Sequence, residues 1–126
     1  MSDSKSKIPT AEEFERASKL MEERARNLDR VRDRVLEHFR GRCPLHEFFI
    51  LDQRDVDFRA YVFFEQTKDI AAMKQVGVEC EIVDFVYAEL ERLGRGRRDE
   101  INVAFEFDSH EHVQAKFGGN YLNRLR

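Results

Sequence analysis

Apolar residues in the first third of the chain recur with a helical period. Phe14, Met21, Leu28 and Val35 follow one another every seven residues, with further apolar residues beside them. This spacing is typical of the apolar stripe along one face of an amphipathic helix. The pattern predicts one long helix over residues 9–40.

The length of this helix suggests a role in association. About 30 residues at roughly 1.5 Å each give a helix of ~45 Å, which exceeds the width of a domain of this size. Part of it is therefore expected to project, and a homodimer through it is one partner hypothesis. Arg24 and His38 fall on the stripe and disfavour a long coiled coil.

Two strands are expected next. Segment 45–51 is rich in aromatic and branched residues, 52–55 has turn chemistry, and 56–65 alternates strictly. The short connection makes the pair an antiparallel hairpin. The apolar face of the second strand is Val56, Phe58, Ala60, Val62 and Phe64, and the face expected to be wet is Asp57, Arg59, Tyr61, Phe63 and Glu65.

The middle of the chain fits helices, with one ambiguity. A short helix capped by Thr67 is expected first. Segment 76–93 then fits two patterns. Val76, Val78, Cys80 and Ile82 recur every two residues, as on one face of a strand. Val78, Ile82, Val86 and Leu90 recur every four residues, as on one face of a helix. The helical pattern explains more residues and ends at a glycine, so a helix is the prediction.

A third strand is predicted at 101–107, where apolar and polar residues alternate again. The element order α-β-β-α-α-β-α predicts an α+β fold: a small antiparallel sheet of about three strands with helices packed on one face. Residues 1–8 are expected to be a disordered tail and 9–126 a single domain. The end of the chain is expected to add an edge strand or to dock by Tyr121, leaving Arg124 and Arg126 free.

Composition narrows the class of protein. Apolar residues make up 41% of the 126 residues, charged residues 37%, and the net charge is -3, which is typical of a globular chain. Cys43 and Cys80 lie far apart without metal-ligand spacing, and neither a secretory signal nor an apolar run of membrane length is present. A cytoplasmic location with no disulfide is expected.

Charge is concentrated in the middle of the chain. Residues 45–92 contain five basic and eleven acidic residues, a net charge of -6. This disfavours nucleic acid as a partner there and is compatible with a basic protein partner.

The wet face of the predicted sheet is the first candidate site. If the strand at 101–107 pairs with the strand at 56–65, carboxylates, a guanidinium and an aromatic ring share one surface. Such a mixture suits protein recognition and also acid-base chemistry. The candidate protein-binding residues are Asp57, Arg59, Tyr61, Glu65, Asn102 and Glu106.

The segment 108–112 is a second candidate, with two interpretations. As a helix start, Asp108 or Ser109 would be the N-cap, and His110 and His112 would point about 200° apart. As an extended segment, the two histidines would share a face and bind a metal with Asp108 or Glu106. His-x-His alone is a weak metal motif, so the capping interpretation is favoured.

Three arginines in the loop before the third predicted strand form a candidate anion site: Arg95, Arg97 and Arg98. The loop leads from a helix into a strand, whereas phosphate-cradling loops lead from a strand into a helix. A solvated connector is therefore favoured, and nucleic-acid binding is disfavoured.

These patterns favour a noncatalytic module that binds another protein, for example a small acidic inhibitor of the immunity type. No cofactor is expected, and no nucleophile stands in a recognisable context. The first alternative is a metal-assisted hydrolase or nuclease using Asp108, His110 and His112. The second is nucleic-acid binding through the three loop arginines.

Overall fold

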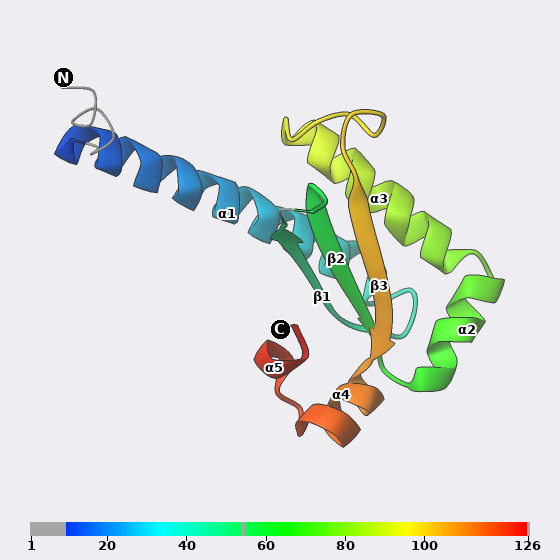
Figure 1. Cartoon of the computed structure of the whole chain (residues 1–126). Coiled ribbons are helices and arrows are strands. Elements are labelled where there is room, and N and C mark those ends of the chain that lie inside the picture. Colours follow the sequence, from blue (N-terminus) through cyan, green and yellow to red (C-terminus); the bar gives the residue numbers. More distant parts are fainter. Residues whose placement is uncertain (1–9, 54, 126) are drawn as a thin grey trace.

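Strand β2 (Phe58–Phe64) lies in the centre of a three-stranded sheet, between β1 (Leu45–Asp52) and β3 (Val103–Ser109) (Figure 1). The computed structural model describes residues 10–53 and 55–125, and the fold is a mixed α+β fold. The predicted tail at 1–8 and Arg126 lie outside the described residues. The helices are α1 (Ala11–Phe39), α2 (Thr67–Gln75), α3 (Val78–Arg92), α4 (His110–Phe117) and α5 (Tyr121–Leu125).

The predicted hairpin is confirmed. β1 and β2 are antiparallel, with Phe48 opposite Val62 and Asp52 opposite Phe58. The register shifts between Leu45 and Glu47, so that one extra residue of β1 is accommodated by a bulge.

The prediction of an all-antiparallel sheet is wrong for β3. This strand runs parallel to β2, in a register that pairs Phe58 with Val103 and Phe64 with Ser109. The segment that connects β2 to β3 contains α2 and α3. It is long enough to return the chain to the end of the sheet where β2 begins, so that β3 can run in the same direction as β2. Alternation within a strand carries no information about its direction.

Helices cover both faces of the sheet, not one face as predicted. Residues of α1 and α3 pack with Phe58, Ala60, Val62 and Phe64 of β2 in the larger core. Val113 of α4 packs with Tyr61 and Phe63 on the opposite face, together with partly buried residues of α4 and α5. β2 is therefore buried from both sides.

Helix α1 begins at a capping residue, since Thr10 Oγ1 accepts a hydrogen bond from the Glu13 N–H at 3.1 Å. In its second half Leu28, Val31 and Val35 are buried against the sheet and α3. Its first half runs away from the sheet (Figure 1). Ala17 of the stripe is exposed in this half, and the side chains of Phe14, Leu20, Met21 and Ala25 lie outside the described part.

The helix predicted for the ambiguous segment is confirmed as α3, which starts after Gly77 in the left-handed conformation (φ 83°). α2 is capped by Gln66 and not by Thr67, because the Gln66 N–H donates to Asp69 at 2.9 Å. β3 extends two residues beyond the prediction, to Ser109. The end of the chain forms the helix α5 and not an edge strand.

The second core is tested by a pair of substitutions. Val113 is fully buried, whereas Leu122 on α5 is 76% exposed. Val113→Ala should lower the free energy of unfolding by about 1–2 kcal/mol because it removes buried methyl groups and leaves a cavity. Leu122→Ala should change it by less than about 0.5 kcal/mol. Urea denaturation of both variants measures this, and equal effects would contradict the second core.

Candidate functional site

The C-terminal helices cover part of the sheet face that the sequence predicts to be wet. Tyr121 of α5 packs edge-on against Phe63, with ring centroids 4.9 Å apart. Tyr61 is 6% exposed and Phe63 is fully buried. The prediction that these two aromatic residues face water is therefore wrong.

Arg124 of α5 binds this face through ion pairs. Its Nε donates to Asp108 at 2.7 Å and its NH2 group donates to Glu106 at 3.2 Å. The other oxygen of Glu106 accepts a hydrogen bond from Arg59 at 3.2 Å. The guanidinium of Arg124 also lies over the rings of Tyr61 and Phe63. The prediction that Arg124 is free for a partner is wrong.

The environment of Asp108 favours its ionised form. Burial alone would raise the pKa of this carboxyl, but hydrogen bonds from Arg124, His112 and the Ser109 N–H outweigh burial and lower the pKa. Burial likewise opposes the charge of Arg124, and its bonds to Asp108 and Glu106 raise its pKa overall. Both groups are therefore charged at neutral pH, and the pair acts as a structural anchor.

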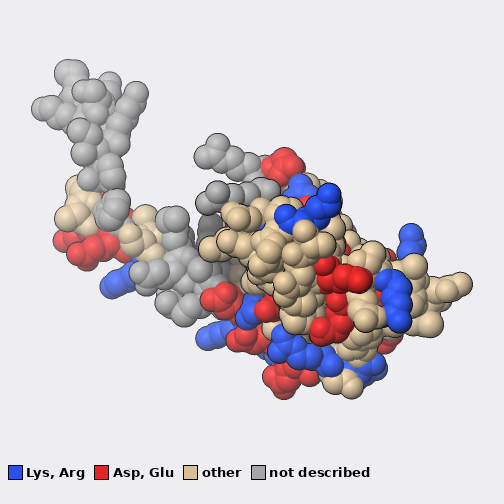
Figure 2. Space-filling model, turned by 90° about the horizontal axis from the view of Figure 1, so that it is seen from below, with Lys and Arg blue, Asp and Glu red and all other residues tan. Residues whose placement is uncertain are grey.

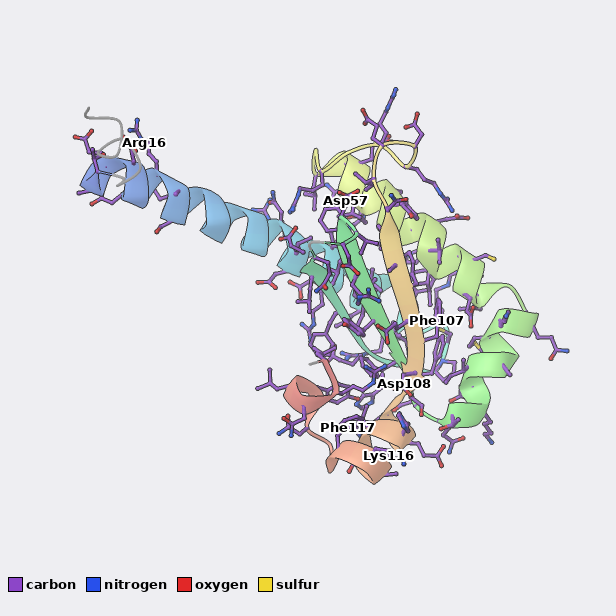
Figure 3. The ribbon with its side chains drawn as sticks, viewed as in Figure 1. Arg16, Asp57, Phe107, Asp108, Lys116 and Phe117 are labelled. Carbon is purple, nitrogen blue, oxygen red and sulfur yellow. The ribbon has the colours of Figure 1, made fainter. Side chains whose placement is uncertain are left out.

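The six predicted binding residues do not form one surface. Asp57 accepts a hydrogen bond from the Asn102 N–H at 2.8 Å, at the end of the sheet opposite Asp108 (Figure 3). Glu65, beyond the other end of β2, binds His46 instead. Arg59, Tyr61 and Glu106 lie between these ends, in the network with α5.

The histidines of segment 108–112 diverge, as the capping interpretation predicts. Ser109 Oγ caps α4 by accepting from the His112 N–H at 3.0 Å, and the His112 ring donates to the Asp108 carboxylate at 3.0 Å. His110 points elsewhere, with its ring stacked on His46 at 3.9 Å. Among residues 10–53 and 55–125, no group of three or more candidate ligands is placed to hold a metal ion.

A cavity of about 340 Å³ adjoins His46. The His46 Nδ1–H donates to both oxygens of Glu65, at 2.8 and 3.0 Å, which fixes the orientation of the ring. A histidine held in this way suits acid-base chemistry. The cavity is lined by Arg40, Cys43, Pro44, Leu45, His46, Glu47 and Glu65.

The other reactive groups near this cavity are not activated. Burial raises the pKa of the Cys43 thiol, which donates to the Phe39 carbonyl at 3.4 Å, so the nucleophilic thiolate is disfavoured. Burial, followed by the nearby carboxylates of Glu47, Glu65 and Asp108, raises the pKa of Tyr121 to about 12. The cavity therefore contains an oriented histidine without an activated nucleophile beside it.

The three loop arginines have carboxylate partners. Arg95 binds Asp52 at 3.0 Å and Arg98 binds Asp84 at 2.6 Å. Arg97 lies 3.4 Å from the carboxylates of both neighbouring acidic residues in the loop. These charges are compensated within the chain, which weakens the anion-site prediction. On the face shown in Figure 2, basic and acidic side chains are also interspersed.

A comparison of the chain with protein-family models, curated proteins and solved structures finds no match. In the part of the chain that the structure describes, no helix is long and apolar enough to cross a membrane.

The Arg124 anchor is tested by removing its charge. Arg124→Met leaves Asp108 and Glu106 without this partner and should lower the free energy of unfolding by about 1–3 kcal/mol at neutral pH. The folded-state pKa of Asp108 lies below its unfolded value of about 4, so its ionised form stabilises the fold above that pH. This stabilisation is lost as the pH falls through the folded-state pKa.

The difference in stability between wild type and Arg124→Met should accordingly shrink below about pH 4. Denaturant unfolding at several pH values measures it. Arg97→Met is the control, because Arg97 is exposed and pairs only within its loop. An Arg124→Met variant as stable as wild type at neutral pH would contradict the anchoring role.

Proposed function

We propose that the protein is a noncatalytic module that binds another protein through the first half of a long N-terminal helix, α1. The first support is that the candidate catalytic groups are bonded to one another and to neighbouring helices. Asp108 and Arg124 anchor α5, His112 binds Asp108, and His110 stacks on His46. These contacts give the groups structural roles. His46, which Glu65 orients beside a cavity, has no activated nucleophile among the residues that line that cavity.

The observation that carries the proposal is the continuation of the apolar stripe beyond the sheet. Leu28 and Val35 of the stripe are buried, and the seven-residue spacing continues backwards to Met21 and Phe14. The segment from Ala11 to Leu28 spans roughly 25 Å at about 1.5 Å per residue. In Figure 1 no other helix or strand of the described residues lies along the part of α1 that extends beyond the sheet.

The partner surface that fits this stripe is an amphipathic helix, which would bury its own apolar face against α1. Acidic and basic residues alternate in groups along the first half of α1: Glu12, Glu13 and Glu15, then Arg16 and Lys19, then Glu22 and Glu23, then Arg24 and Arg26. An antiparallel helix with the same order of charges would place opposite signs together. A second copy of α1 satisfies this condition, and so does a partner protein with a similar helix.

The acidic middle of the chain also favours a partner with a basic surface. The net charge of -6 over residues 45–92 would speed association with a positively charged protein. A small acidic inhibitor of the immunity type is one form that such a binding module would take.

The proposal is tested by substitutions on and off the stripe. Phe14→Ser combined with Met21→Ser removes apolar side chains from the stripe. Asp29→Ser combined with Arg30→Ser is the matched control, because both residues are exposed on α1 beyond the proposed binding segment and the net charge is unchanged. Neither pair should alter urea unfolding of the core.

Each protein is tagged and used to capture binding proteins from its source cells, with quantification by mass spectrometry. Partners should be retained by wild type and by the control, and reduced at least about tenfold by the stripe variant, which corresponds to about 1.4 kcal/mol. Sedimentation of the purified proteins separates a second copy from another protein. Equal capture and equal sedimentation of all three proteins would rule out the α1 surface.

A further inference from the structure

The two edges of the sheet differ in how their outward-facing backbone groups are bonded. On the β1 edge, a side chain of α1 and that of its C-cap residue bind two of the outward-facing carbonyl groups. Arg32 Nε donates to the Phe48 carbonyl at 3.0 Å, and the Arg40 guanidinium donates to the His46 carbonyl at 2.7 Å. Occupied carbonyl groups and charged side chains block the pairing of a further strand.

The β3 edge lacks such protection in its centre. The Phe58 N–H donates to the Asn102 carbonyl at 3.1 Å. Since alternate residues of a parallel strand bond to the same neighbour, the backbone groups of even-numbered residues of β3 bond to β2. The backbone groups of its odd-numbered residues face outward. Of the outward N–H groups, that of Val103 donates to the Tyr87 hydroxyl at 3.2 Å, and that of Ser109 donates to Asp108 at 2.8 Å.

Phe105 and Phe107 lie between these two capped positions. Within the described residues, no side chain bonds to the outward backbone groups of either phenylalanine. Every residue from Val103 to Phe107 is also only half-buried, unlike Ala60, Val62 and Phe64 of the central strand. The centre of this edge is therefore unpaired, and its residues are less buried than those of the central strand.

An aromatic row accompanies this edge. The rings of Phe105 and Phe107 are stacked with centroids 6.2 Å apart, and the Tyr87 ring of α3 lies 6.1 Å from that of Phe105. Tyr87 also lines a cavity of about 250 Å³ on the outer side of α3. The other lining residues are Asp84, Ala88, Glu91 and Arg98.

We propose that the β3 edge binds a short extended segment of a partner protein, which adds a fourth strand to the sheet. The segment carries apolar side chains at alternate positions and at least one basic side chain. An extended backbone presents N–H and C=O groups with a period of two residues, which matches the outward groups of Phe105 and Phe107. Its apolar side chains extend the aromatic row.

The basic side chain follows from the charges beside the cavity. Arg98 is paired with Asp84 at 2.6 Å, with its guanidinium over the Tyr87 ring. Glu91 forms no ion pair with any other described residue. The lining thus has one uncompensated carboxylate, which a lysine or arginine of the segment would pair with.

A short segment fits this edge better than the sheet of a second copy. α2 contacts β3 and lies beyond it, on the side away from β2 (Figure 1). A second copy paired through β3 would bring its own α2 into the same region. This inference goes beyond the proposed function, because it uses neither α1 nor its partner.

The probe is a phage-displayed library of random peptides about seven residues long, a usual strand length. Selected peptides are synthesised and their affinity for the full chain is measured by fluorescence polarisation. Each peptide is then N-methylated at single positions. Methylation at alternate positions should abolish binding, and methylation at the positions between them should be tolerated, because only every second amide faces β3.

Two variants place the peptide on the molecule. Ala88→Trp fills the cavity beside Tyr87 from an exposed position and should weaken binding at least about tenfold. Ala115→Trp is the matched control on α4, where the residue is also exposed, and should leave binding unchanged. Urea unfolding verifies that both variants fold.

Three results together would support the proposal. The selected peptides contain apolar and basic residues, N-methylation abolishes binding only at alternate positions, and binding is lost in Ala88→Trp but not in Ala115→Trp. Failure to select any peptide would overturn it, as would peptides that bind both tryptophan variants equally or show no alternation. Dimerisation of the unliganded chain that is lost in Ala88→Trp would also overturn it, in favour of a second copy at this edge.

Discussion

The burial of β2 from both sides is the constraint on which the rest of the structure depends. Seven consecutive residues of this strand, Phe58–Phe64, are apolar or aromatic apart from Arg59. A strand of this composition needs a layer on each face. α1 and α3 supply one layer, and the C-terminal segment must supply the other.

The short C-terminal helices can form a layer because a charged anchor supplements their small apolar contact. Val113 is the buried residue of α4, and within the described residues α5 has none. The bonds from Arg124 to Asp108 and Glu106 connect α5 directly to β3. The carboxylates that resemble a functional site in the sequence are thus used to hold this layer in place.

The sequence predicts the elements well because alternation and helical spacing reflect which face of each element is buried. It predicts the hairpin, α3 and the cap of α4 for this reason. It does not predict the direction of β3, since the same alternation suits parallel and antiparallel strands. It also assigns Tyr61 and Phe63 to water, because the segment that covers them is distant in sequence and has little apolar content of its own.

The same limit applies to the candidate sites. Arg124 gives no local signal of its partners, since the two carboxylates lie on β3, 16 and 18 residues away in the chain. The open edge of β3 is invisible in sequence as well, because it follows from the strand order and from the phase of the ladder. Both faces of the sheet are covered, so the two proposed binding surfaces lie elsewhere, on the first half of α1 and at this edge.

Amide hydrogen exchange of the unliganded protein, followed by NMR, tests the central claim most directly: that β2 is enclosed and pairs with a parallel β3 whose outer edge is open. The amides of β2 and those of Ala104 and Glu106 should exchange slowly, because they lie in the ladder. The amides of Phe105 and Phe107 should exchange much faster. Slow exchange at Phe105 and Phe107, or fast exchange at Ala104 and Glu106, would contradict the account.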